Sequence, residues 1–242
     1  MSGENELARK VAVITGGSGA IGCAICEKLA QAGSCAISFD VAAPARREIP
    51  YVWCDVRDDA SVAAAVEKVR REHGRVDLVI HAAGVSRDAV VWKLSPDDWD
   101  LVQSVNLRGA FFLLRHATPA LRAAGGGRVI FIGSINGSRG KFGTSAYSAS
   151  KAGLVGLAKS AARELARFGV LVNVIEPGWV RTPMTEATPQ NVRDAALAES
   201  LVGSFLDPED IAAAALFLCG AGGRRITGQI LRVDGGQFLG PV

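Results

Sequence analysis

The sequence has 242 residues, of which 49% are hydrophobic and 21% are charged, and its formal net charge is +3. This length and composition can build a sizeable core in one large domain or two small ones, and exclude a largely disordered chain. A small net charge without clustered Lys or Arg gives no reason to expect nucleic acid or an anionic membrane as a partner.

Short apolar runs alternate with helical patterns from end to end. We expect strands at residues 11–14, 35–39, 51–54, 76–80, 128–132, 170–175 and 229–233. Between them we expect helices at residues 19–31, 61–71, 95–124 and 208–219, and one that carries Tyr147 and ends near residue 168. Apolar strands that alternate with helices predict an α/β fold, a doubly wound parallel sheet of seven strands flanked by helices.

Nothing in the sequence marks a linker or an internal repeat, so residues 1–242 are interpreted as a single domain. Residues 182–204, which include Pro183 and Pro189, show no clear core pattern and are predicted to form a mobile lid over a substrate. No apolar run reaches the ~18 residues of a membrane span. Residues 1–10 are polar and do not resemble a signal peptide.

The five cysteines are odd in number, which favours reduced thiols and a cytoplasmic protein. Cys23 and Cys26 form a C-x-x-C without the second pair of a zinc site, which leaves either a redox role or buried helix cysteines. His73, His81 and His116 show no metal-ligand spacing and are expected to be structural. No metal is predicted.

Tyr147 and Lys151 are four residues apart in a helical segment, so their side chains share one helix face. A phenol loses its proton near pH ~10, and a neighbouring ammonium favours the phenolate and lowers that pKa. The pair therefore indicates a proton donor or acceptor, although such pairs also arise by accident on solvated helices.

A glycine-rich turn, residues 15–22, follows the first strand and opens the first helix. Glycine permits the tight turn, and the helix N-terminus offers free N–H groups to a pyrophosphate, although an ordinary glycine turn is the alternative. Asp40 ends the second strand at the offset typical of an acid that binds the ribose of NAD, unless it is only a loop acid. Arg46 and Arg47 could instead accommodate NADP, so the sequence favours NAD(H) over NADP(H) without excluding the latter.

Taken in order, these motifs resemble the short-chain dehydrogenase/reductase family over essentially the whole chain. The resemblance rests on the glycine turn, Asp55-Val56, His81-Ala82-Ala83-Gly84, Asn106, Ser134, Tyr147-x-x-x-Lys151, Pro177-Gly178 and Thr182. It implies a Rossmann fold and an oxidoreductase that interconverts a carbonyl and a secondary alcohol by hydride transfer with a nicotinamide cofactor.

The resemblance also implies residue roles. Tyr147 would be the acid/base, Lys151 would lower its pKa and hold the nicotinamide ribose, and Ser134 would hydrogen-bond the substrate oxygen. Asn106 would interrupt its helix and hold a water near Lys151. If they have no catalytic role, Ser134 would be only a turn serine and Asn106 only a helix-surface amide.

The implied cofactor-binding residues are Gly16, Ser18, Gly19, Ala20, Ile21, Gly22, Asp40, Asp55, Val56, Ala83, Gly84, Tyr147, Lys151, Pro177, Gly178, Val180 and Thr182. Asp55 and Val56 would flank the adenine, and Val180 and Thr182 would lie near the carboxamide. The sequence departs from the family pattern at Ala20, where glycine is usual, and at His81-Ala82, where two asparagines are usual.

Residues 84–88, 92–100 and 134–143 are similar to 3-oxoacyl-thioester reductases, which implies reduction of a 3-oxoacyl thioester to the 3-hydroxyacyl thioester. Three features weaken this implication: those reductases usually prefer NADP, residues 125–127 lack the basic residues typical of carrier-protein-dependent members, and the direction of Arg167 is open. Oxidation of a cyclic or other secondary alcohol is the alternative, and a non-catalytic NAD(H)-binding protein is the remote one.

The family resemblance also implies a homotetramer. Small residues at Ala149, Ala152, Gly153 and Gly156 would permit close packing between subunits, but would equally suit a helix buried within one chain.

Overall fold

The computed structural model describes residues 7–240, in which seven parallel strands form one sheet in the order β3-β2-β1-β4-β5-β6-β7. The strands are β1 Val11–Thr15, β2 Cys35–Asp40, β3 Tyr51–Trp53, β4 Leu78–His81, β5 Gly127–Ile132, β6 Val170–Pro177 and β7 Ile230–Val233. The strand order reverses between β1 and β4, which makes the sheet doubly wound, as predicted.

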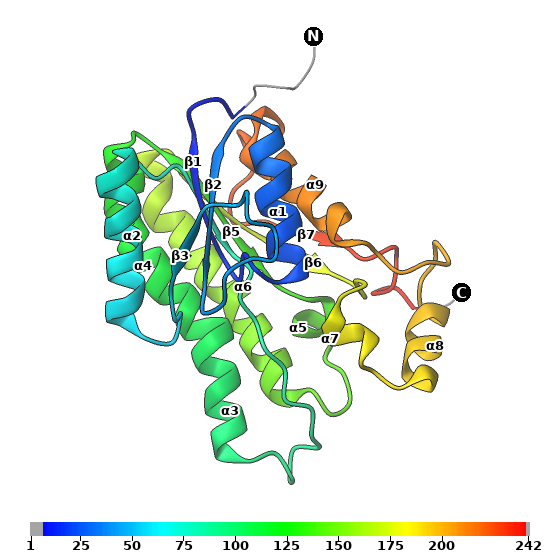
Figure 1. Cartoon of the computed structure of the whole chain (residues 1–242). Coiled ribbons are helices and arrows are strands. Elements are labelled where there is room, and N and C mark those ends of the chain that lie inside the picture. Colours follow the sequence, from blue (N-terminus) through cyan, green and yellow to red (C-terminus); the bar gives the residue numbers. More distant parts are fainter. Residues whose placement is uncertain (1–6, 241–242) are drawn as a thin grey trace.

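Helices cover both faces of the sheet (Figure 1). On one face lie α1 (Ala20–Gln31) and α9 (Pro208–Cys219), and on the other lie α2 (Asp59–His73), α4 (Gly109–Ala123) and α6 (Ser145–Leu165). Because successive side chains of a strand point to opposite faces, Val13 packs into the core under α2, α4 and α6, whereas Ile14 packs into the core under α1 and α9.

The helix expected over residues 95–124 is interrupted. Ser95 caps α3 (Pro96–Gln103) by accepting a hydrogen bond from Asp98 N, with Pro96 in the first turn as predicted. A π-helical turn, η1 (Ser104–Arg108), then separates α3 from α4 and contains Asn106. Such π turns inside helices often occur at functional sites.

Three short helices were not predicted from the sequence: α5 (Ile135–Arg139), α7 (Pro183–Glu186) and α8 (Gln190–Ala198). Residues 182–204 thus hold two helices, and their mobility stays a prediction. Short 3₁₀ turns, η2 (Ala166–Phe168) and η3 (Ala221–Gly223), follow α6 and α9. In Figure 1, α3, α5, α7 and α8 lie toward the end of the sheet away from the N-terminus. Within residues 7–240 no helix has the length and apolar character needed to cross a membrane.

Candidate active site

Two neighbouring cavities that share part of their walls form a groove at the carboxyl ends of the strands, where open α/β sheets bind their ligands. A cavity of about 390 Å³ lies against the glycine turn, and one of about 520 Å³ lies beyond β2 and β3. The walls of both include Gly16, Gly19, Ala82 and Gly84. Every residue predicted to bind the cofactor lines one or both of these cavities.

The glycine turn brings the backbone close to its neighbours. Gly16 has a φ of +67°, and a β-carbon there would lie 2.6 Å from the backbone N of Ala83. A β-carbon on Gly22 would lie 2.1 Å from the carbonyl oxygen of Gly16. Gly19 precedes α1 and supplies no capping side chain, so the helix N-terminus faces the cavity as a diphosphate site would require. Ala20 is the first residue of α1 and lines the same cavity.

Asp40 lies at the far end of the groove. Its carboxylate accepts hydrogen bonds from Ser18 N at 3.2 Å and Ala42 N at 3.3 Å, which fixes it at the wall of the larger cavity. Arg46 is paired with Glu27 on α1. The charge of that arginine is therefore partly neutralised before any 2′-phosphate binds.

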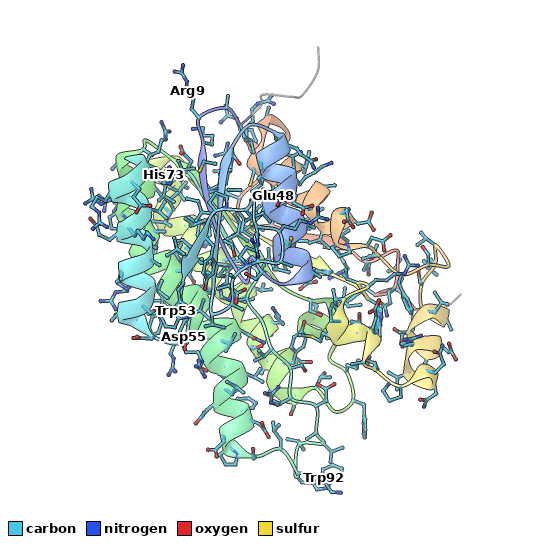
Figure 2. All side chains as sticks on the ribbon, in the orientation of Figure 1. Arg9, Glu48, Trp53, Asp55, His73 and Trp92 are labelled. Carbon is cyan, nitrogen blue, oxygen red and sulfur yellow. The ribbon has the colours of Figure 1, made fainter. Side chains whose placement is uncertain are left out.

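Asp55 follows β3 and lies near the lower edge of the sheet in Figure 2. Its carboxylate is held by Arg57, with Nη2 2.7 Å from Oδ2, and this hydrogen bonding lowers the pKa of Asp55. Asp55 and Val56 both line the larger cavity, and their place beside an adenine stays a prediction.

A third cavity, of about 450 Å³, opens on the other side of Tyr147. Tyr147 and Ser134 line both this cavity and the one against the glycine turn. Ser134 lies two residues after the end of β5 and caps α5, with its Oγ accepting a hydrogen bond from Asn136 N at 3.2 Å. An atom transferred between molecules bound in the two cavities would therefore pass next to the Tyr147 and Ser134 hydroxyls.

Tyr147 and Lys151 share one face of α6, as predicted, with Lys151 Nζ 5.5 Å from the centre of the Tyr147 ring. Burial lowers the pKa of Lys151 to about 8. Its Nζ donates a hydrogen bond to the Ile132 carbonyl at 2.8 Å.

The predicted fall in the pKa of Tyr147 is not observed in this structure. Burial of the phenol raises its pKa, and hydrogen bonding to Ser134 only partly offsets that effect. Spacing placed the ammonium on the correct face, but the cost of burying the phenolate is the larger effect.

Asn106 is fully buried in the π turn, so it is not a helix-surface amide. Its Oδ1 accepts from Val85 N at 2.8 Å, and its Nδ2 donates to the Val85 carbonyl and the Ser150 hydroxyl, both at 3.0 Å. A β-carbon on Gly84 would lie 3.4 Å from Lys151 Nζ and 3.6 Å from Asn106 Oδ1. The amide and the ammonium thus flank the same glycine.

His81, at a position where the family usually has asparagine, hydrogen-bonds on both sides of its ring. Its Nδ1 lies 2.8 Å from the Thr15 hydroxyl and its Nε2 lies 3.2 Å from the Asn106 carbonyl oxygen. Burial lowers the pKa of His81 to about 3. The neutral ring can therefore accept from Thr15 and donate to Asn106, which joins β1 to the π turn.

The cysteines are free thiols, and all five lie within the described residues. Burial raises the pKa of Cys26 and Cys219 to about 12, which opposes formation of a reactive thiolate. Among residues 7–240 no group of three or more His, Cys, Asp or Glu side chains is placed to hold a metal ion.

Sequence reasoning missed part of the third cavity's wall. Gln237, from the turn after β7, is buried there and accepts a hydrogen bond from Trp179 N at 2.8 Å. Arg139 and Lys141 also line this wall. No local pattern marks Gln237, whereas Arg139 and Lys141 lie within residues 134–143, the segment whose sequence is similar to 3-oxoacyl-thioester reductases.

Comparison with known proteins identifies the family over most of the chain. A family model described as Enoyl-(Acyl carrier protein) reductase matches residues 17–237. The 3-oxoacyl-(acyl-carrier-protein) reductase FabG of Thermotoga maritima is 35% identical, covering 97% of this chain and 100% of its own. The chain belongs to the short-chain dehydrogenase/reductase family. The acetoacetyl-CoA reductase of Acinetobacter sp. is 34% identical over 96% of this chain and 98% of its own.

Solved structures of the family superpose closely. The crystal structure of gox2181 has a TM-score of 0.94 at 28% identity and covers 98% of both chains. The aldohexose dehydrogenase of Thermoplasma acidophilum has a TM-score of 0.91 at 26% identity, covering 97% of this chain and 96% of its own. This chain is therefore an oxidoreductase with a Rossmann fold, of a family that binds nicotinamide cofactors.

Proposed function

We propose that this enzyme reduces a 3-oxoacyl thioester to the 3-hydroxyacyl thioester, with Tyr147 as the proton donor. The observation that carries the proposal is the position of Tyr147 and Ser134 in the shared wall of two cavities. One cavity has the glycine turn of a dinucleotide site, and the other is large enough to hold a carbonyl substrate. The proposed reaction centre is the boundary between them.

Ser134 and Tyr147 have separate roles in the proposed reduction. A reduced nicotinamide, which the glycine turn and Lys151 would hold, would supply the hydride when bound. The Ser134 hydroxyl donates a hydrogen bond to the carbonyl oxygen, which stabilises the charge that develops there. Tyr147 then transfers its proton to that oxygen. Because burial raises its pKa, Tyr147 is protonated at neutral pH, which suits the reductive direction.

Lys151 is proposed to return the proton to Tyr147. Its pKa of about 8 lies near neutral pH, and in proton transfer such a group can both give up and regain a proton. Asn106 fixes the backbone at Val85 beside it, and is proposed to hold the water that connects Lys151 to solvent. Lys151 would also hold the nicotinamide ribose.

The thioester substrate is supported by the relatives. The two curated relatives compared above are named for 3-oxoacyl-(acyl-carrier-protein) and acetoacetyl-CoA reduction.

Two arginines support a substrate that is bound to a carrier protein. Although residues 125–127 are glycines, Arg122 and Arg167 both lie on the Phe168 ring, with their Cζ atoms 4.1 and 4.7 Å from its centre.

NAD(H) is proposed as the cofactor. The support is the Asp40 carboxylate at the wall of the larger cavity, with Arg46 already paired to Glu27. The same observation favours a second candidate, the NAD-dependent oxidation of a secondary alcohol such as a sugar. The close superposition on an aldohexose dehydrogenase adds to it.

Homotetramer formation is proposed from the surface of α6. Ala149, Ala152 and Gly156 are exposed in the single chain, and Phe111 on α4 is 45% exposed. These residues are therefore not buried by the chain's own fold. Light scattering of the purified protein tests this proposal, because a monomer would contradict it.

A substrate panel tests the proposed reaction. It compares acetoacetyl-CoA and acetoacetyl-N-acetylcysteamine with crotonyl-CoA, simple ketones and sugar alcohols, each with NAD(H) and NADP(H). We expect the highest kcat/KM for a 3-oxoacyl thioester with NADH. Preferred reduction of crotonyl-CoA would indicate an enoyl reductase, and preferred oxidation of a polyol would favour the second candidate.

A further inference from the structure

The third cavity, which is the proposed substrate cavity, has two cationic side chains in its wall, and the surroundings of these two side chains differ. Arg139 is neutralised, since its Nη2 lies 2.7 Å from Glu199 Oε2 and its Nη1 donates to the Gln237 carbonyl at 3.1 Å. Lys141 instead lies over the Trp179 ring, with Nζ 4.8 Å from the ring centre. Among residues 7–240 no carboxylate forms an ion pair with Lys141.

The acids nearest to Lys141 are already engaged. Glu199 binds Arg139 and also accepts from Gln237 Nε2 at 3.1 Å. Asp88 accepts a hydrogen bond from the Ser86 hydroxyl. Burial is the main cause that lowers the pKa of Lys141, with Arg139 acting in the same direction, while Glu199 and Asp88 oppose them. Lys141 is nevertheless an exposed residue in the wall of the cavity, so its ammonium is open to a ligand and has no paired anion among residues 7–240.

An ammonium has three N–H donors, and a ring face satisfies at most part of that capacity. We propose that Lys141 determines specificity by binding an anionic oxygen group of the substrate, a carboxylate or a phosphate, in the cavity where Tyr147 and Ser134 hold the carbonyl. The Trp179 ring supports the aliphatic part of the substrate and keeps the lysine in place. This inference rests on the proposed carbonyl reduction and adds the charge of the substrate.

Three substrates separate the possible sources of the anion. Acetoacetyl-CoA carries phosphates, acetoacetate carries a carboxylate, and acetoacetyl-N-acetylcysteamine carries neither. Each is assayed with the wild type, Lys141→Met and Lys141→Arg. Lys68→Met is the matched control, because Lys68 is an exposed lysine on α2.

Lys141→Met is expected to raise KM about tenfold for one anionic substrate, the size of one charge-assisted hydrogen bond, with kcat within about twofold. The neutral thioester should be unaffected, and Lys141→Arg should restore most of the loss. The anionic substrate that responds identifies the group that Lys141 binds. Equal effects on all three substrates, or no effect on either anionic one, overturn the inference.

A binding measurement keeps the test independent of turnover. Coenzyme A and acetoacetate are each titrated while tryptophan fluorescence is followed, because Trp179 contacts Lys141. The wild type should bind one of them about tenfold more tightly than Lys141→Met does. Equal binding by the two proteins overturns the inference. Lack of turnover on all three substrates, with this difference in binding intact, refutes only the proposed reaction.

Discussion

Replacing Lys151 by Met should make the cofactor-free protein more stable at neutral pH. Lys151 is 4% exposed, and burial lowers its pKa from 10.5 to about 8. A shift of about 2.5 units corresponds to about 3 kcal/mol by which the buried ammonium opposes folding. Methionine keeps most of the apolar stem but loses the hydrogen bond to Ile132, worth about 1 kcal/mol. The net gain expected at pH 7 is about 2 kcal/mol.

The sign of the pH dependence follows from the depressed pKa. Between the folded value of about 8 and the unfolded value near 10.5, the unfolded chain binds more protons, so the stability of the wild type rises with pH. At pH 9.5 the cost of the buried charge has fallen to about 1 kcal/mol. His81, on which Lys151 also acts, has a pKa of about 3 and stays neutral across this window.

Urea unfolding of both proteins at pH 7 and pH 9.5 measures the effect. The difference in unfolding free energy between Lys151→Met and the wild type should shrink by about 2 kcal/mol across this range. Other titrating groups are common to the two proteins and cancel in the comparison. A gap that stays constant with pH would refute the reasoning, because Lys151 would then not carry a depressed pKa.

Three further predictions concern single features of the site. Asp40→Ala should shift the NADH to NADPH ratio of kcat/KM at least about tenfold toward NADPH, since a partly exposed carboxylate repels a phosphate by about 1–4 kcal/mol; an unchanged ratio would contradict the role of Asp40. Because burial raises the pKa of Tyr147, reduction should stay constant through neutral pH and fall only in the alkaline range, while alcohol oxidation rises with pH; a pH–rate series in both directions would expose the opposite trend. Asn106→Ala leaves both Val85 backbone groups and the Ser150 hydroxyl without their partner, so it should cost about 2–4 kcal/mol of unfolding free energy, and a loss below about 0.5 kcal/mol would show that these bonds are readily replaced.

The sheet and the main site residues could be predicted because their signals are local. Apolar runs mark β1 to β7, and glycines mark the turn into α1. The four-residue spacing of Tyr147 and Lys151 places both side chains on one face of α6 whatever the tertiary structure. The interruption at Asn106 was expected from family resemblance, and the structure shows its form as a π turn.

The short helices could not be predicted because long-range contacts hold them. In α5, Ser138 donates a 2.6 Å hydrogen bond to Glu176 on β6, and Arg139 pairs with Glu199 after α8. In α8 only Ala196 is buried, and its carbonyl accepts from Gln237 Nε2. Neither helix has the apolar periodicity that a sequence pattern needs.

The direction of the Tyr147 pKa was beyond sequence reasoning for a related reason. Spacing shows that Lys151 is near the phenol, but burial depends on how α6 packs against the rest of the fold. The contact of Lys141 with Trp179 likewise joins the loop before α6 to the segment after β6. Such contacts between distant segments require the structure.

The proton-donor role of Tyr147 is tested most directly by Tyr147→Phe, with turnover and cofactor binding measured on the same sample. Loss of the phenol hydroxyl should lower kcat for the best substrate of the panel about 10²–10⁴-fold. The Kd for NADH, from fluorescence titration, should stay within about twofold, because the ring still lines the cofactor cavity. A variant that retains kcat within about tenfold of the wild type would contradict the account.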